Sequence, residues 1–425
     1  MVLKNPNAYL SDKIKIYIDG VAINNEIAGS SNFYMDFPMQ LVDKIEVLRG
    51  PGSALYGAGA FYATVNIITK MGNSKKENQI FVGMGSYNYF TTGANVHVAA
   101  GDWDLFSDGY YQQNQKRLHI DLRNEQTDEV MQDLSVGFKA QNGNFEFQTR
   151  FKHNISGNFY GFEGVIDDQQ NQEHINTYFF TQLAYKADFN GFNLNTKASF
   201  SHRELDVGAN IEINEAKFNS KFAVVGVNDM NDSFAYNENS HEQNFEIESI
   251  LTLPKIASND ILIGIGARQV NVTYDNFESS IEGAIAANKS QIENHVNFNQ
   301  FDFNADSESA YWANPTTTLL KANTQRTIAY TYIQDLITVT DSIDLILGLR
   351  ADHYSDFGLQ LSKRAGLVYR ANEKYIFKLL YGSAFRAPTL IEAYQNGHIN
   401  FVQGMKILNL KRQTLMKPWL FIFQI

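Results

Sequence analysis

The chain contains no cysteine and only 7 proline residues among 425. The absence of cysteine excludes disulfides, thiolate zinc sites, iron–sulfur clusters and cysteine nucleophiles. Lys and Arg number 35 against 46 Asp and Glu, which gives a formal net charge of −11, and no Lys/Arg run occurs. This balance argues against a nucleic-acid partner, because phosphate neutralisation needs a clustered basic surface.

Long hydrophobic runs are also missing. No stretch of ~18 uncharged apolar residues occurs, so the sequence predicts no transmembrane helix. The mean hydropathy of −0.30 does not exclude a membrane, because strands of a transmembrane barrel alternate lipid-facing and lumen-facing residues. Residues 1–13 lack a charged segment followed by an apolar one, so we expect no signal peptide in this chain.

Aromatic residues are abundant instead, with 31 Phe and 22 Tyr. From about Gln79 onward, apolar and polar residues alternate with period two, which is typical of strands with one apolar face. Short turns such as Asn190-Gly191 alternate with long polar stretches, the rhythm of an outer-membrane barrel. About 13 strands are predicted: 79–86, 89–100, 103–115, 131–140, 144–153, 176–188, 192–202, 241–253, 260–272, 326–339, 343–353, 363–370 and 374–383.

The expected fold class is therefore all-β, an antiparallel transmembrane β-barrel. A soluble β-sandwich or propeller also alternates, but polar stretches such as 203–240 and 273–325 are too long for compact soluble domains. The alternation also predicts which side chains face lipid and which face the lumen. The lipid-facing set is Phe145, Phe147, Phe151, Phe192, Leu194 and Phe200, and the lumen-facing set is Glu146, Arg150, Asn193 and Lys197.

Residues 1–70 have a different texture, with apolar clusters at 14–18, 45–48 and 65–68 around a Gly-rich stretch at 50–59. This pattern indicates a small α+β unit. The segments Tyr17-Ile18-Asp19-Gly20-Val21, 43–51, 53–57 and 65–70 closely resemble the C-terminal half of the plug domain of TonB-dependent outer-membrane receptors. The motif positions are Asp19, Gly20, Glu46, Arg49, Gly50, Pro51, Tyr56, Gly57 and Asn66.

Barrel motifs of the same family resemble three later segments. These are 332–335, 348–355 and 381–389, the last containing Phe385, Arg386, Ala387 and Pro388. The resemblance implies a barrel closed by an N-terminal plug, located in a Gram-negative outer membrane and in contact with its lipid. It implies energy-coupled uptake of a scarce nutrient with a TonB-type complex as partner. It requires no catalytic residue, resident metal or cofactor.

The resemblance favours an iron–siderophore chelate as ligand. A haem receptor of the same family is the alternative, with His398 as candidate ligand and His353 as a second one. In that case His398→Ala should abolish haem-dependent growth without lowering expression. A passive porin would lack the plug motif, and an enzyme barrel would need a Ser/His or Asp/His group that the sequence does not identify.

Two charged motif residues, Glu46 and Arg49, are expected where the plug meets the barrel wall. A buried charge without a partner costs several kcal/mol, so these residues should pair with lumen-facing groups. The candidates are Glu146, Arg150, Glu246 and Glu248. The alternative is that Glu46 and Arg49 pair locally within the plug.

Three segments are therefore expected: part of the plug at 1–70, the first part of the barrel at 79–404, and a tail at 405–425. Plugged transporters have about 22 strands, so the barrel should be incomplete and its sheet open. Residues 405–414 fit no family pattern, yet a permitted codon choice contains Asn-Glu-Asn-Leu-Lys-Pro-Glu-Thr in another frame. We therefore predict that 405–425 are out-of-frame translation, which the nucleotide sequence would test. The first half of the plug and the TonB-contacting segment are expected to be absent.

Overall fold

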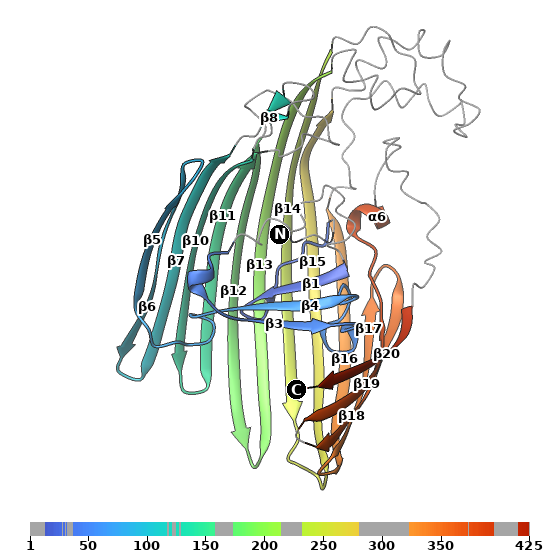
Figure 1. Cartoon of the computed structure of the whole chain (residues 1–425). Helices are drawn as coiled ribbons and strands as arrows, with labels where there is room; N and C mark the ends of the chain where they lie inside the picture. Colours follow the sequence, from blue (N-terminus) through green and yellow to red (C-terminus); the bar gives the residue numbers. More distant parts are fainter. Residues whose placement is uncertain are drawn as a thin grey trace, which may run out of the picture.

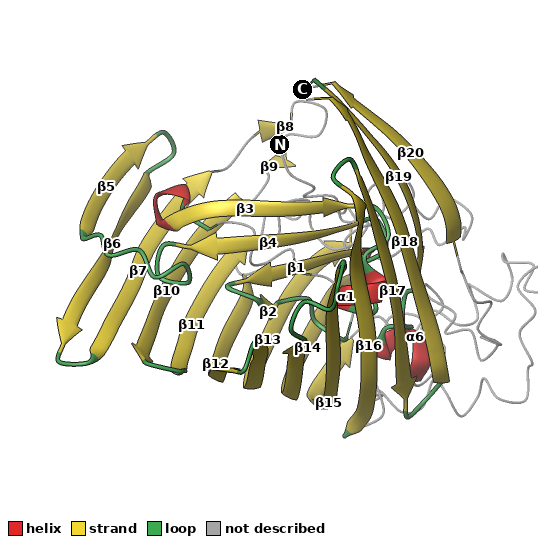
Figure 2. Cartoon of the chain, turned by 90° about the horizontal axis from the view of Figure 1, so that it is seen from below, coloured by secondary structure: helices red, strands yellow, loops and turns green. Residues whose placement is uncertain are grey.

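A computed structural model describes residues 13–27, 29, 31, 37–116, 119–120, 125–126, 129–157, 173–213, 232–279, 323–372, 374–394 and 415–424. Two sheets dominate. A small four-stranded sheet lies against the concave side of a large antiparallel sheet of fourteen strands (Figure 1). Seen from below, the large sheet curves around the small one (Figure 2). None of the helices among these residues is long and apolar enough to cross a membrane.

The small sheet is the plug unit expected from residues 1–70. Its elements are β1 Ile14–Ile18, β2 Val21–Ala22, a 3-10 helix Met39–Leu41, β3 Val42–Arg49, α1 Ser53–Tyr56 and β4 Ala63–Thr69. The strand order is β2-β1-β4-β3. β1 is parallel to β4 and β3 is antiparallel to it. Apolar residues at alternate positions of β1, Ile16 and Ile18, are buried, which explains why this segment forms a strand.

The large sheet runs in chain order from β5 to β20, apart from the short pair β8 His119–Ile120 and β9 Glu125–Gln126. Its first half contains β5 Gln79–Gly85, β6 Tyr89–Ala100, β7 Trp103–Lys116, β10 Glu129–Asn142, β11 Phe145–Gly157, β12 Glu173–Phe189 and β13 Phe192–Ile213. Its second half contains β14 Asp232–Thr252, β15 Asn259–Ser279, β16 Thr324–Thr340, β17 Ile343–Tyr354, β18 Gly358–Asn372, β19 Tyr375–Ala384 and β20 Leu415–Gln424. A short helix, α6 Leu390–Tyr394, follows β19.

All of the predicted strands are present, and the all-β fold is confirmed. The expectation of a loop over 203–240 is partly wrong, because β13 extends to Ile213 and β14 begins at Asp232. These two strands pair with each other across 21 positions of register from Asn193 to Ile213, so polar sequence here forms a hairpin instead of a loop. β20, paired with β19, was not predicted. Among the described strands, β5 and β20 are not paired with each other, so the sheet is open.

Alternation along the strands confirms the predicted facing. On β11, Phe145 is 54 % exposed on the convex side whereas Arg150 is 1 % exposed on the concave side. The convex face carries ring contacts between strands, such as Phe200 with Phe245 at 4.7 Å between centroids. Phe200 and Lys197 lie on opposite faces of β13, because their sequence separation is odd.

The core lies between the two sheets. Ile16, Ile18, Ile23 and Leu41 of the plug form one buried cluster with Tyr110, Tyr178 and Phe180 of the large sheet. The plug strands therefore need the concave wall to bury their apolar face, since a four-stranded sheet exposes both of its faces. A second cluster gathers Ile328, Tyr330, Tyr332 and Tyr354 of the wall with Leu55 and Phe385 nearby.

Candidate functional site: the plug–barrel interface

The turn after β1 places Asp19 against the wall. Asp19 has φ 50, its Oδ1 accepts from the Thr69 N–H at 2.7 Å, and Arg150 on β11 lies 3.6 Å away. Burial raises the pKa of the Asp19 carboxyl, with Arg150 and the Thr69 hydrogen bonds opposing that rise. Its backbone carbonyl also accepts from Gln148 Nε2 at 3.2 Å. Arg150 is shared with Asp108 on β7, at 2.7 Å. This turn therefore joins a plug acid to a charged network of the wall.

The segment that follows β2 is held more firmly still. Arg203 donates from Nη2 to the Ile23 carbonyl at 2.6 Å. The Glu26 N–H donates to Glu242 Oε2 at 2.8 Å, and the Glu26 carbonyl accepts from the Leu390 N–H at 2.9 Å. Residues 19–26 are thus bound by backbone and side-chain contacts from the strands of the wall and from α6.

Glu26 is the electrostatic centre of this segment. Its Oε1 lies 2.8 Å from Arg268 Nη1 on β15, and its Oε2 lies 3.5 Å from Arg326 Nη1 on β16. Burial alone would raise the pKa of Glu26, but Arg268, Lys15 and Arg326 together hold it at about 2. Burial lowers the pKa of the Lys15 ammonium, with Arg268 adding to the effect. Glu26 is therefore ionised at neutral pH and bridges two barrel strands.

The helix α1 docks on the other side of the plug. Arg350 on β17 donates from Nη1 to the Leu55 carbonyl at 3.1 Å and pairs with Asp352 at 2.9 Å. Its guanidinium lies 4.0 Å from the Tyr330 ring centroid. Gly57 has φ +71, and a Cβ there would meet Arg350 Nη2 at 3.1 Å. Glycine is therefore required both by the backbone and by the close approach of Arg350.

The two motif regions meet at this helix. The Phe385 N–H lies 3.4 Å from Ser53 Oγ, and the Phe385 carbonyl accepts from the Gly59 N–H at 3.4 Å. Pro388 offers its carbonyl to Arg326 Nη1 at 2.9 Å. Arg386 pairs with Glu392 of α6 at 2.6 Å, and this hydrogen bond helps to lower the pKa of the Glu392 carboxyl against the opposing effect of burial. The segment 385–388 is thus a docking element for the plug.

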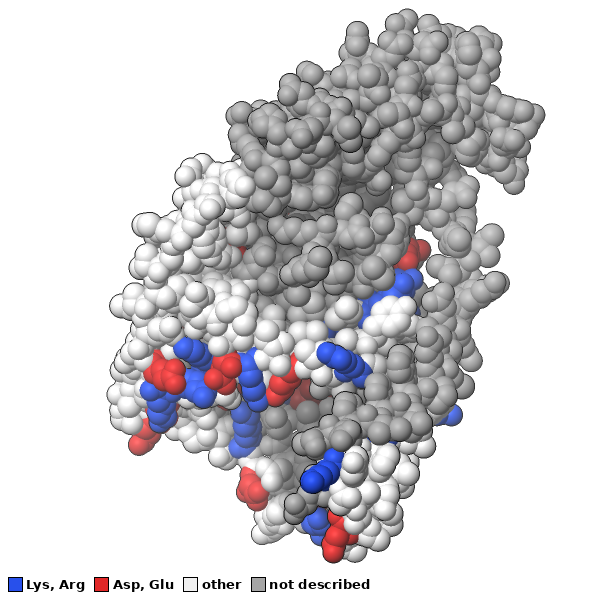
Figure 3. Space-filling view, in the orientation of Figure 1, with Lys and Arg blue, Asp and Glu red and all other residues white. Residues whose placement is uncertain are grey.

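A cavity of about 380 Å³ lies between the plug and strands β12–β17. The plug side contributes Lys15, Tyr17, Tyr56 and Gly57, and the wall side contributes Glu246, Glu248, Tyr330, Tyr332, Arg350 and Asp352. Tyr330 donates to Glu246 Oε1 at 2.8 Å and Tyr332 donates to Glu248 Oε1 at 3.0 Å. In the space-filling view, charges of both signs gather in a band at the level of the plug sheet (Figure 3). The plug is therefore held to the wall by polar contacts around this cavity as well as by an apolar core.

Family comparison agrees with this architecture. The family described as "TonB dependent receptor-like, beta-barrel" matches residues 69–414, and "TonB-dependent Receptor Plug Domain" matches residues 7–64. The chain belongs to the TonB-dependent receptor family. Barrels of these receptors are outer-membrane proteins, and the family is one of receptors and transporters.

Sequence relatives of this receptor chain include proteins named vitamin B12 transporter. The protein from Vibrio vulnificus (strain CMCP6) is 28% identical over 152 residues, which cover 35% of this chain and 23% of the relative. The protein from Photobacterium profundum is 26% identical over 200 residues, covering 46% and 30%. These matches span about a quarter to a third of the relatives' length.

Solved structures share the fold with this receptor chain. The siderophore receptor PirA from Acinetobacter baumannii superposes with a TM-score of 0.59 at 16% identity, covering 90% of this chain and 55% of that one. The FrpB iron transporter from Neisseria meningitidis gives 0.60 at 15% identity, covering 89% and 57%. The receptor chain therefore spans a little over half the length of these structures.

The expected pairing of Glu46 and Arg49 with the wall is wrong. Glu46 pairs with Lys44 at 2.7 Å within β3, and its side chain is 53 % exposed. Arg49 is exposed at the end of β3. The reason is the strand order, which places β3 at the edge of the plug sheet far from β12–β15 (Figure 2). The local alternative is the one observed for Glu46.

The wall residues proposed as partners do face the concave side, but with other contacts. Arg150 pairs with Asp108 and Asp19, and Glu146 accepts from Lys186 at 2.8 Å. Gly20 and Gly50 adopt φ +81 and +96 as turn residues. Pro51 packs against Gly382, where a Cβ would approach the proline ring to 2.9 Å. Asn66 lies on β4 opposite Glu46.

The histidines proposed for haem do not come together in the described residues. His398 lies outside them. His353 is exposed on β17, while its neighbours Asp352 and Tyr354 are buried toward the plug. Its side chain is therefore on the convex side, away from the cavity.

Sequence reasoning missed the residues that hold the plug most directly: Lys15, Glu26, Arg268, Arg326 and Tyr330. Arg268 and Arg326 occupy polar positions of alternating strands, so the pattern could have marked them as lumen-facing. Glu26 has no such signal, since it lies in an irregular segment after β2. Its role depends on three strands that are distant in sequence.

Proposed function

We propose that this receptor takes up an iron chelate across the outer membrane, with energy supplied by a TonB-type complex. The observation that carries the proposal is the attachment of plug residues 19–26 to the concave wall through Asp19, Ile23 and Glu26. A plug seated in this way would block passive flow. Solved structures of proteins titled siderophore receptor and iron transporter support the chelate as ligand.

Release would proceed from the same contacts. Residues 19–26 are consecutive, so a pull on this stretch separates Asp19 from Arg150 and Glu26 from Arg268 in one movement. The cavity beside them, lined by Lys15 and Glu246 among others, would widen as the plug leaves the wall. Transport by this route needs no catalytic group, only mechanical work on a polar interface.

Uptake measurements test the proposal. Iron-starved cells expressing the receptor, with and without a functional TonB complex, are given radiolabelled ferric siderophores or radiolabelled cobalamin. TonB-dependent accumulation of iron is expected. Accumulation of cobalamin alone would replace the iron chelate by the ligand named for the sequence relatives.

A passive porin predicts a different outcome. Solute entry that does not depend on TonB, together with rapid swelling of liposomes containing the receptor in small sugars, would overturn energy-coupled uptake. If iron enters only as haem, His398→Ala should abolish that growth, and the iron-chelate assignment would be replaced by haem.

A further inference from the structure

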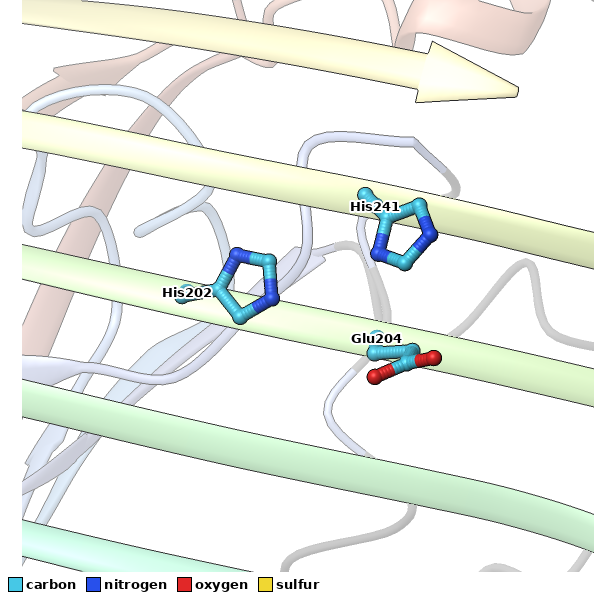
Figure 4. A group of neighbouring side chains, drawn as sticks. All are labelled: His202, Glu204 and His241. Atoms are coloured by element: carbon cyan, nitrogen blue, oxygen red, sulfur yellow. The ribbon is translucent and has the colours of Figure 1, made fainter. Parts of the chain in front are cut away.

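A group of metal-ligating side chains lies outside the plug interface. His202 and Glu204 on β13 and His241 on β14 each offer one donor atom, and these atoms all lie within 4.8 Å of one another. Figure 4 shows the two imidazoles and the carboxylate grouped over adjacent strands. His202 and Glu204 share a face because they are two residues apart, and His241 is directly opposite Glu204 in the register.

This group faces away from the plug. Ser201, Arg203 and Glu242, which alternate with its members, are buried on the concave side. Arg203 bonds to the Ile23 carbonyl and Glu242 accepts from the Glu26 N–H. His202, Glu204 and His241 therefore lie on the convex face, each half-buried, and take no part in holding the plug.

The group lies at the edge of the apolar band. One step toward the β12–β13 turn, Phe200 contacts Phe245 on the same face, with ring centroids 4.7 Å apart, and Ile247 follows. At the level of Glu204 the neighbouring outward residue is Thr177, which is bonded to His153 at 3.0 Å. The group is thus at a polar boundary, where metal ions have access from water.

The donor set fits zinc. Zinc in proteins takes His nitrogen and Glu oxygen at about 2.0–2.2 Å, and three protein ligands leave one position open. The two imidazole rings are stacked with centroids 5.8 Å apart. His202 Nδ1 is shielded from solvent and has no hydrogen-bond partner among the described residues. Small rotations of the three side chains would bring the donor atoms onto one ion.

We propose that His202, Glu204 and His241 form a binding site for a zinc-class divalent ion on the convex face of the barrel. The ion would join β13 to β14 at the polar edge of the apolar band. Its open position would be filled by water or another small ligand. Because the group does not contact the plug, this site is independent of the transport proposal.

Zinc titration of the purified receptor in detergent tests the site, with competition against a chromophoric zinc chelator. One Zn²⁺ per chain is expected, and stoichiometric binding should be lost in His202→Ala and His241→Ala. Glu204→Gln should weaken binding at least tenfold. The matched control is His353→Ala, which removes an exposed convex-face histidine from β17 and should leave binding unchanged.

A second readout separates site loss from misfolding. Zinc should raise the thermal unfolding midpoint of the wild type in proportion to the logarithm of its concentration, because ligands that bind only the folded state stabilise it. His202→Ala should keep the metal-free midpoint and lose this dependence. Absence of zinc binding in the wild type, or equal binding in His202→Ala, His241→Ala and wild type, would overturn the proposal and leave a plain cross-strand polar contact.

Discussion

The Glu26 carboxylate of the plug lies 2.8 Å from the Arg268 guanidinium of β15, and the two residues are 242 positions apart in the chain, from 26 to 268. Arg326 approaches the same carboxylate from β16 at 3.5 Å. Glu26 is 15 % exposed, so water screens this pair only in part. The plug is therefore locked to two barrel strands at one acidic side chain.

Removing this acid should loosen the plug. Breaking one side of a buried pair costs about 3–5 kcal/mol because the partner charge remains. Since the chain has no cysteine, a single Ala54→Cys in buried α1 reports plug opening through maleimide labelling. Glu26→Gln should speed labelling on the order of a hundredfold. Glu46→Gln, which removes a carboxylate exposed on β3, should leave the rate unchanged, and equal rates in both variants would contradict the lock.

Acid should remove the contribution of Glu26 in a defined range. The folded-state pKa of about 2 lies below the ordinary value of 4.5, so the carboxylate stabilises the folded state above pH 4.5. This stability is lost as pH falls from 4.5 toward 2, and amounts to about 3 kcal/mol. The free energy of unfolding of wild type minus that of Glu26→Gln, measured by denaturant titration, should shrink over this range. A difference constant with pH would count against the shift.

Gly57→Ala should be more damaging than an alanine at a comparable turn. Gly57 combines φ +71 with ψ −157, and Arg350 stands 3.1 Å from the position of a new Cβ. Backbone strain of this kind costs about 1–3 kcal/mol, and displacement of Arg350 adds to it. Gly143→Ala, at φ +52 with nothing within 4 Å, should carry the smaller strain alone. Labelling of Ala54→Cys in each background measures the difference, and equal effects would exclude a role for Arg350.

The facing of β11 can be tested by charge. Phe147 is exposed on the convex side and Glu146 lies on the concave side. A Lys or Arg on the lipid face at mid-membrane costs roughly 2–4 kcal/mol. Phe147→Arg should therefore lower the yield of folded receptor in lipid vesicles far more than Glu146→Gln does. Similar yields would mean that this part of β11 does not face lipid.

The sequence alone determined the fold class, the positions of the barrel strands and their facing. It could do so because alternation with period two is a local property, which assigns Phe145 and Arg150 to opposite faces within one strand. It also located the plug, since the glycines at 50 and 57 mark turns that other residues disfavour. The polar ends of β13 and β14 were not predicted, because pairing across a hairpin, and not hydrophobicity, forms them.

Tertiary structure alone decided which charges meet. Glu46 lies in the clearest plug motif, yet it pairs with Lys44 because β3 is the edge strand remote from the wall. Glu26 lies in a segment without any motif, yet Arg268, Arg326 and Glu242 converge on it. His202, Glu204 and His241 likewise become neighbours only through the register of β13 with β14. Ion pairs and ligand sets depend on distances between strands far apart in the chain, and local patterning carries no information about those distances.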